Sequence, residues 1–230
     1  MAKNTLGIVI PEPANNEFEV EIIGSTPLIE KDFSAKDLKA IEDGQQGVAK
    51  PKKEPRKPKE EFERARIRNA KGQDCVKTIW FKKAMAAMGG YFGIPRGTVE
   101  QGVYIIGDLI PIKHSGKAPT MRSDRVNLNQ GMVKKTSVAY RPEFHNWSCR
   151  LRIGFDSSVL TPQQVLSLLA HAGMKNGVGE WRPQKGGDFG RFTVRPVGKQ
   201  PKASPVKTSR KVARGEAQAV ANKTVRRGAR

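Results

Sequence analysis

Residues 148–173 read SCRLRIGFDSSVLTPQQVLSLLAHAG and predict a strand followed directly by a helix. Apolar residues at 149, 151, 153 and 155 alternate with polar ones, which is the pattern of a strand buried on one face. Thr161, Pro162 and Gln164 then form a helix start, because Thr caps the helix, Pro suits its first position and Gln completes a capping box. Apolar positions 165, 168, 169 and 172 share one helical face, and Gly173 is expected to end the helix.

Similar patterns lie on both sides of this stretch. FEVEIIG (18–24) and GRFTVRPV (190–197) alternate like strands, and VYIIGDLIPI (103–112) predicts one or two short strands broken near Gly107. TIWFKKAMAAM (78–88) predicts a helix capped by Thr78, with positions 81, 84, 85 and 88 on its buried face. The order is strand, helix, strand, strand, helix, strand. We therefore expect an α+β fold with an RRM-like or ferredoxin-like β-α-β-β-α-β core.

The remaining segments suggest how the chain is organised around this core. A short helix is expected over 35–41, capped by Ser34, and residues 60–69 are ambiguous between helix and strand. The expected parts are an extended lead (1–16), one domain (17–197) and a disordered basic tail (198–230); the domain holds an irregular basic insertion (43–60) and a long thumb-like loop (113–137).

Charge is concentrated in two segments. The chain has 230 residues and a formal net charge of +20. Residues 198–230 hold ten Lys and Arg against one Glu, and residues 50–59 hold six against one Glu. Such segments attract polyanions without reading sequence, although a solubilising role is the simpler alternative. No apolar run reaches the ~18 residues of a membrane span, and the opening MAKNTLGIVIPEP has no apolar signal core, so neither a transmembrane nor a secreted protein is expected.

Cysteine and histidine are scarce. The two Cys cannot form a disulfide scaffold, and with three scattered His they form no zinc-type cluster. We therefore expect a cytoplasmic protein with no metal and no cofactor. His114, His145 and His171 belong to no nucleophile or metal motif, so an enzyme is not expected. The fallback among enzymes is a metal-independent ribonuclease that uses His114.

The most distinctive motif is the Gly-rich stretch KNGVGEWRPQKGGDFG (175–190). It is neither a Walker loop nor a Rossmann fingerprint. Glycines let the backbone approach a ligand, and exposed N–H groups beside cations can hold phosphate. The candidate nucleic-acid contacts in it are Trp181, Arg182, Lys185, Gly186 and Gly187. The alternative is a sharp turn packed by Trp181.

Further candidate contacts come from other segments. Arg141 lies in YRPEFHNW (140–147), where aromatics beside an Arg can stack on unpaired bases. The alternatives there are core packing and, for Arg141, an ion pair with Glu143 or Asp124. Flexible loop arginines suit phosphate clamping, and strand 148–155 has a polar face with two arginines. The candidates from these two sources are Arg122, Arg125, Arg150 and Arg152.

Five stretches together resemble a family of uncharacterised bacteriophage proteins: EVEIIGSTPLI (19–29), TIWFKKAMAAM (78–88), SDRV (123–126), AYRPEFHNWSCRLRIGFD (139–156) and LLAHAGMKNGVGEWRPQKGGDFGRFTV (168–194). The last contains the motif GxGEWRPxKGGxFGxF, and the resemblance spans roughly 18–195. The layout is similar, more remotely, to RAMP-type backbone subunits of CRISPR effector complexes. Those have an RRM-like core, an Ile-Gly-x-x-Pro-Leu first strand, an inserted thumb loop and a terminal Gly-rich loop.

RAMP-type subunits bind RNA along a filament of identical subunits. The resemblance therefore implies that Lys82, Lys83, Arg122, Arg125 and the 177–190 loop line a groove for a single strand. It implies a phage-encoded, non-enzymatic protein of the host cytoplasm that binds single-stranded RNA or DNA and forms a homo-oligomeric filament or ring. The alternative is a virion structural, assembly or anti-defence protein that acts through protein contacts.

Overall fold

The computed structural model describes residues 14–32, 35–48, 55–130 and 133–197. The chain divides into two units, Met1–Gln200 and Pro201–Arg230, and all described residues belong to the first. The expected lead up to residue 13, the cap at Ser34 and the tail from residue 198 lie outside the described residues.

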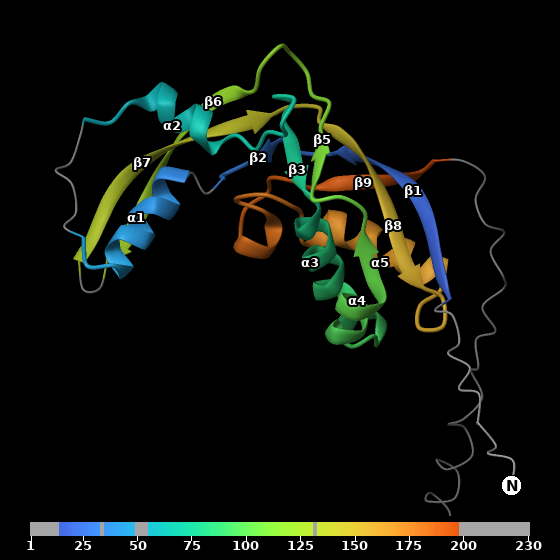
Figure 1. The fold of residues 1–230 in the computed structure, drawn as a ribbon. Coiled ribbons are helices and arrows are strands. Elements are labelled where there is room, and N and C mark those ends of the chain that lie inside the picture. Colours follow the sequence, from blue (N-terminus) through green and yellow to red (C-terminus); the bar gives the residue numbers. More distant parts are fainter. Residues whose placement is uncertain (1–13, 33–34, 49–54, 131–132, 198–230) are drawn as a thin grey trace, which may run out of the picture. The chain divides into compact units, whose positions relative to one another are not determined.

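The main sheet has four antiparallel strands in the order β4-β8-β1-β9 (Figure 1). They are β1 (Asn15–Gly24), β4 (Val103–Ile105), β8 (Ser148–Asp156) and β9 (Phe192–Pro196). Helices α3 (Thr78–Met88) and α5 (Pro162–Lys175) lie side by side against this sheet. The expected α+β class is confirmed, as are all the strands expected from alternation.

One face of this sheet forms the core with α3 and α5. Val20 lies opposite Leu151 in the β1–β8 register, and both side chains are fully buried. Phe81 of α3 and Leu168 of α5 are fully buried in the same apolar cluster. The alternating residues of β1 and β8 point to the other face, as their period of two requires.

The helix starts were predicted with different success. For α5 the capping box is present, since Thr161 Oγ1 accepts from the Gln164 N–H at 3.2 Å and Gln164 Oε1 accepts from the Thr161 N–H at 2.8 Å. This helix continues two residues past Gly173, to Lys175. The N-cap predicted for α3 is wrong: Lys77 is the N-cap, and the Thr78 hydroxyl donates to the Gly107 carbonyl at 2.7 Å.

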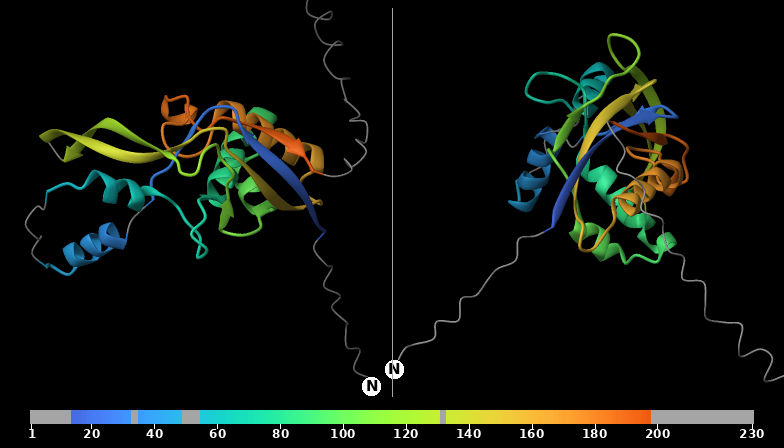
Figure 2. Two further views of the ribbon diagram at one scale, coloured as in Figure 1. Left: turned by 90° about the horizontal axis from the view of Figure 1, so that it is seen from above. Right: turned by 90° about the vertical axis from the view of Figure 1, so that its right-hand side faces the viewer.

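Most of the segment expected to be a thumb-like loop, 113–137, is instead part of a hairpin. Strands β6 (Thr120–Gln130) and β7 (Val133–Phe144) pair over their whole length, and β2 (Leu28–Ile29) adds to β7. The hairpin extends away from the four-stranded sheet (Figure 2). Met121 and Val138 of the hairpin are exposed. A strand with little buried surface does not need an apolar residue at every second position, and the sequence of the hairpin accordingly shows no apolar period.

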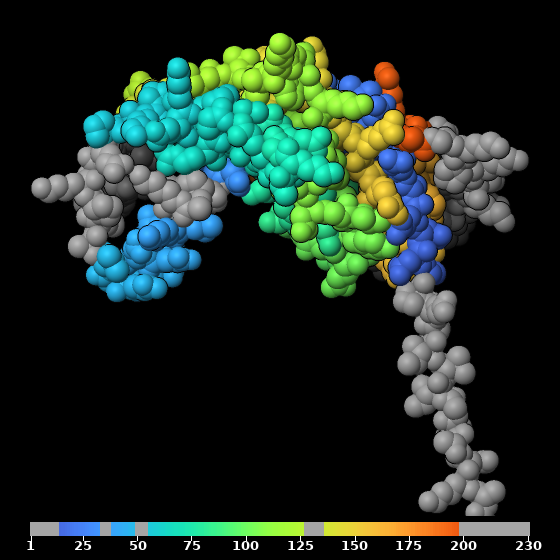
Figure 3. All heavy atoms as spheres, turned by 45° about the horizontal axis from the view of Figure 1, so that its top comes forward, coloured from blue at the N-terminus to red at the C-terminus, as the bar shows by residue number. Residues whose placement is uncertain are grey.

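The insertion expected to be irregular, 43–60, also contains regular structure. Helix α1 spans Ala35–Gln45, and α2 spans Pro58–Ala65 with Pro58 in its first turn. Phe62 of α2 is buried, and Figure 3 shows this helix packed along the hairpin. The ambiguity over 60–69 is thus resolved as helix up to Ala65.

Shorter elements complete the described part of the chain. They are β3 (Cys75–Lys77), η1 (Gly89–Phe92), α4 (Arg96–Gly102), β5 (Leu109–Pro111) and η2 (Pro183–Lys185). Strands β3 and β5 form a two-stranded sheet of their own, and the expected break near Gly107 separates β4 from β5. Among the described residues, no helix is both long and apolar enough to cross a membrane.

Candidate nucleic-acid interface

The Gly-rich loop is anchored by backbone hydrogen bonds. The Val178 N–H donates to the Gly190 carbonyl at 2.9 Å and so closes the loop on itself. The Gly190 N–H donates to the Pro27 carbonyl at 2.8 Å, and the Glu180 N–H donates to the Ile29 carbonyl at 2.9 Å. The loop is therefore held against β2 and the short connection from β1 to β2, and its outer residues have fixed positions.

The two glycines predicted as contacts play different parts in this loop. A Cβ on Gly187 would lie 1.9 Å from the Trp181 carbonyl oxygen, so the close packing of the loop itself demands glycine there. Gly186 has a φ of 80°, and a Cβ added to it would meet no atom within 4 Å. Its backbone conformation favours glycine, and its surface is open.

Trp181 is the most unusual residue of the loop. Its backbone adopts the left-handed conformation, with φ of 52°, which is rare for a bulky side chain and costs free energy. Its carbonyl accepts from the Phe189 N–H at 3.1 Å, which holds that conformation. The side chain is 43% exposed, so the strain presents an indole ring at the surface.

The two cations of the loop differ in their surroundings. Arg182 Nη1 donates to the Gly179 carbonyl at 2.9 Å, and its Nε donates to Gln184 Oε1 at 3.1 Å. Arg182 thus holds the loop from within. Lys185 is exposed and forms no ion pair within the described part of the chain. Of the two, Lys185 has its charge available to an anion.

The arginines at the base of the hairpin are neutralised. Arg122 Nε lies 2.8 Å from Asp124 Oδ1, and its Nη1 lies 3.4 Å from Glu143 Oε2. Arg141 is 6% exposed, and its Nη1 lies 3.6 Å from Asp124 Oδ2. Burial and this pairing favour the structural alternative for Arg141, an ion pair with Asp124, over a contact with bases.

Three other predicted cations keep an uncompensated charge. Arg125 of β6 and Lys83 of α3 are exposed, and Lys82 is half-buried. None of the three forms an ion pair among the residues that the structure describes. They lie on two different elements, and Lys185 lies on a third, the Gly-rich loop.

The outer face of the four-stranded sheet carries charges of both signs. Arg152 Nη2 lies 2.8 Å from Glu17 Oε2, and Arg150 lies opposite Glu21 in the β1–β8 register. Arg195 of β9 lies opposite the same Glu21 from the other side. Because each Arg has a Glu on the neighbouring strand, this face has little net positive potential to offer a polyanion.

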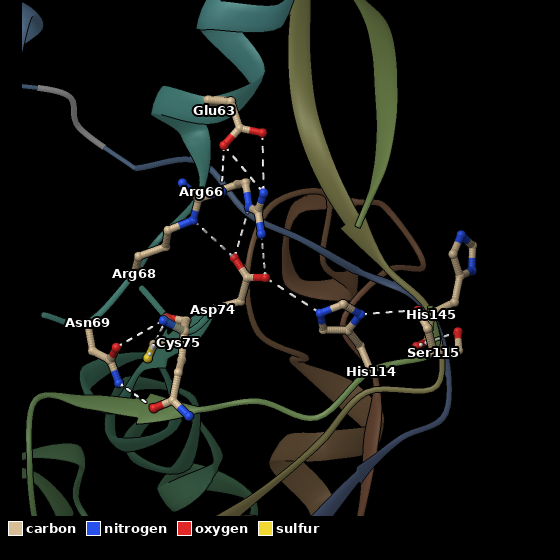
Figure 4. A network of polar contacts seen from close by, with 10 residues as sticks. Glu63, Arg66, Arg68, Asn69, Asp74, Cys75, His114, Ser115 and His145 are labelled. Atoms are coloured by element: carbon tan, nitrogen blue, oxygen red, sulfur yellow. Dashed lines mark hydrogen bonds and ion pairs between the residues drawn. The ribbon is translucent and has the colours of Figure 1, made fainter. Parts of the chain in front are cut away.

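A polar network that was not predicted joins β3 to α2 and the β5–β6 connection (Figure 4). Asp74 is 8% exposed and accepts two hydrogen bonds from Arg66, at 2.9 and 2.7 Å. Arg68 Nε lies 3.7 Å from Oδ1 of the same carboxylate, and His114 Nε2 lies 3.5 Å from Oδ2. His114 Nδ1 lies 3.1 Å from the Ser115 carbonyl oxygen, so both ring nitrogens face acceptors.

Glu30 is a buried acid with few partners. It is fully buried, and neither carboxylate oxygen has a well-aligned hydrogen-bond partner among the described residues. Burial raises the pKa of Glu30 well above its usual value, although a hydrogen bond with the Ile67 backbone acts in the opposite direction.

No group of three or more His, Cys, Asp or Glu suited to a metal ion occurs in the described residues.

The chain is similar to a known protein in structure but not in sequence. No protein-family model matches the chain, and no curated protein matches it. A chain in the cryo-EM structure of the Type III-B Cmr-beta bound to cognate target RNA is similar, with a TM-score of 0.49 and 12% sequence identity. The match covers 79% of this chain and 59% of that chain, so the present chain spans less than two thirds of its length.

Proposed function

We propose that the protein is a non-enzymatic, single-stranded nucleic-acid-binding protein whose copies assemble along the bound RNA or DNA strand. The observation that carries this proposal is the exposed ring of Trp181, held in a left-handed backbone conformation in the same loop as the unpaired Lys185. An aromatic ring stacks on an unpaired base of any identity, and a lysine contacts phosphate. Both requirements for binding a single strand are met within one anchored loop.

The anchoring of the loop matters for the strength of binding. Because backbone hydrogen bonds from Val178, Glu180 and Gly190 already order the loop, binding a strand costs little further loop entropy. The exposed cations Arg125 and Lys83 supply further phosphate contacts in this proposal. They carry no sequence preference, which suits a protein that covers a strand along its length.

In this proposal the four-stranded sheet with α3 and α5 is the RRM-like, ferredoxin-like core. The support is the strand order β4-β8-β1-β9 together with the chain order β1, α3, β4, β8, α5, β9. The hairpin β6–β7 is then an insertion between the second and third core strands, and it contains most of the segment that was expected to be a thumb-like loop. The family resemblance supports a bacteriophage origin and a place in the host cytoplasm.

The proposed strand path avoids the outer face of the sheet, on which RRM proteins stack bases. That face carries Glu17 and Glu21 between its arginines. Carboxylates beside the path would repel phosphates. The Gly-rich loop and the exposed lysine of α3 are therefore the preferred surface.

Binding to a short single strand by the full chain tests the proposal. A labelled strand of about eight nucleotides is short enough to hold one copy, and fluorescence anisotropy reports its affinity. We expect Trp181→Ala to weaken binding about tenfold and Trp181→Phe to retain most of it. Tyr91→Ala is the matched control, because Tyr91 is also an exposed aromatic beside a lysine. Unchanged binding by Trp181→Ala would contradict the proposal.

The ribonuclease alternative is less well supported. A general base needs a free ring nitrogen to take a proton from the attacking hydroxyl. His114 directs one nitrogen at the Asp74 carboxylate and the other at the Ser115 carbonyl. We therefore propose a structural role for His114, as the link between β3 and the start of the hairpin.

A further inference from the structure

A buried arginine beneath the Gly-rich loop lacks hydrogen-bond partners. The side chain of Arg141 is 7% exposed, and its Nε and Nη1 atoms have no hydrogen-bond acceptor among the described residues. Its two ion pairs are long: Nη1 lies 3.6 Å from Asp124 Oδ2, and Nη2 lies 4.0 Å from Glu180 Oε2. A buried donor without an acceptor costs free energy, so such a group in a folded protein requires an explanation.

The neighbouring arginine is much better satisfied. Arg122 and Arg141 lie directly opposite one another in the β6–β7 register, so both side chains lie on the same face of the hairpin. Arg122 donates to Asp124 at 2.8 Å and to Glu143 at 3.4 Å. Like charges directly opposite each other destabilise a strand pair, so two arginines here need anions. Arg122 has the closer contacts with the carboxylates of the hairpin, and Arg141 is left with unused donors.

The anion that the Gly-rich loop supplies to Arg141 is loosely held. Glu180 directly precedes Trp181, and its backbone N–H is fixed to the Ile29 carbonyl at 2.9 Å. Its side chain is 43% exposed, and its carboxylate accepts no hydrogen bond in the part of the chain that the structure describes. Turning this side chain out into water therefore breaks only the 4.0 Å ion pair, and the backbone that presents Trp181 stays in place.

We infer that Arg141 is a binding site for a phosphate of the bound strand, and that the Glu180 carboxylate occupies this site in the free protein and leaves it when the strand binds. A phosphodiester carries one negative charge, so it replaces Glu180 without changing the charge balance of the cluster. A planar guanidinium is also well suited to hold phosphate oxygens. The inference rests on the proposed function and assigns the phosphate beside the base that stacks on Trp181.

Anisotropy titrations of the full chain with the eight-nucleotide strand test the inference. Glu180→Gln removes the competing charge, so we expect it to tighten binding about fivefold. Asp188→Asn is the matched control, because it removes a negative charge from the same loop, where the Asp188 side chain is 86% exposed. It also frees Arg191, so it gives an upper limit for the general effect of charge. We expect it to tighten binding by less than about twofold.

Removal of Arg141 supplies a second measurement. Arg141→Met keeps a long side chain without the charge, and thermal unfolding checks that the variant is folded. In this background, Glu180→Gln should tighten binding no more than Asp188→Asn does. Arg141→Met alone should flatten the slope of log affinity against log salt by about 0.7, the loss of one phosphate contact. A merely structural arginine would alter affinity and leave that slope unchanged. If Arg141→Met does not fold, the comparison of Glu180→Gln with Asp188→Asn decides alone.

The outcomes separate this site from the proposed function. Equal tightening by Glu180→Gln and Asp188→Asn would overturn the inference, and so would tightening by Glu180→Gln that is as large without Arg141. If Trp181→Ala still weakens binding in that case, the proposed function stands and only the phosphate site is lost. A wild-type protein that does not bind the strand would overturn both.

Discussion

The guanidinium of Arg122 lies over the ring of Phe189, 4.7 Å from its centroid, and joins the hairpin to the Gly-rich loop. The Phe189 N–H donates to the Trp181 carbonyl, so the same residue that stacks under Arg122 also holds the strained tryptophan. Arg122 is in turn fixed by Asp124 and Glu143. The position of the Trp181 ring therefore depends on an ion-pair cluster at the base of β6–β7.

Replacing Arg122 should loosen this junction. We expect Arg122→Leu to lower the free energy of unfolding by about 1–2 kcal/mol, because it removes a cation–π contact and takes the guanidinium away from Asp124 and Glu143. Urea denaturation measures the loss. Arg125→Leu on the same strand is the control, since Arg125 is exposed and unpaired among the described residues, and it should change stability little. Equal losses of stability in both variants would show that the contact between Arg122 and the Phe189 ring does not stabilise the fold.

The glycines of the loop should differ in what they tolerate. Gly187→Ala should cost about 3 kcal/mol, because its Cβ would meet the Trp181 carbonyl oxygen and the backbone must shift. Gly186→Ala should cost about 1 kcal/mol, since only its left-handed conformation opposes a side chain. Gly90→Ala, with open space and no positive φ, should be neutral or slightly stabilising. Thermal unfolding of the three variants tests this order.

The core elements were predictable because each has a complete local pattern. The alternation in 148–155 and the Thr161–Gln164 capping box depend only on near neighbours along the chain. The residues expected on the buried face of α5 are indeed buried: Val165, Leu168, Leu169 and Ala172. Local rules therefore sufficed for β8 and α5, each of which buries one face.

The candidate site was less predictable because its pairings cross the chain. Asp124 meets Arg141, and Arg122 meets Glu143, only because β6 and β7 form a hairpin, and that hairpin has no apolar period to reveal it. Likewise, Arg152 meets Glu17 only through the pairing of β1 with β8. The sequence indicates that pairing only through the alternation of glutamates in 17–21 and of arginines in 150–152, because opposite charges favour neighbouring strands.

Glu30 should make stability depend on pH. Its pKa in the folded protein is raised above the ordinary value of 4.5, so the unfolded chain releases this proton first as pH rises. The stability present below pH 4.5 should therefore decline as pH rises toward the folded-state pKa. Glu30→Gln removes this titration, so the variant should become progressively more stable than wild type above pH 4.5.

Urea denaturation of both proteins between about pH 4 and pH 8 measures that difference. Glu100→Gln is the control, because the Glu100 side chain is 41% exposed and pairs with Arg96 on the surface. Its stability should follow the wild-type curve. A constant difference between Glu30→Gln and wild type at every pH would mean that Glu30 does not titrate differently in the folded state.

Salt dependence should separate the free cations from the neutralised ones. Each phosphate contact to a single strand adds about 0.7 to the slope of log affinity against log salt, through counterion release. Lys185→Gln and Arg125→Gln should each flatten the slope by about that amount, because neither cation has a carboxylate partner in the described chain. Arg152→Gln should leave the slope unchanged, since Glu17 already compensates that charge.

Anisotropy titrations of the full chain at several salt concentrations give these slopes. The basic tail is identical in all the proteins, so its contribution cancels in the differences. Flattening by Arg152→Gln without flattening by Lys185→Gln would place the strand on the outer face of the sheet. The opposite pattern would place it at the Gly-rich loop, where the lysine lies in the same anchored loop as the exposed ring of Trp181.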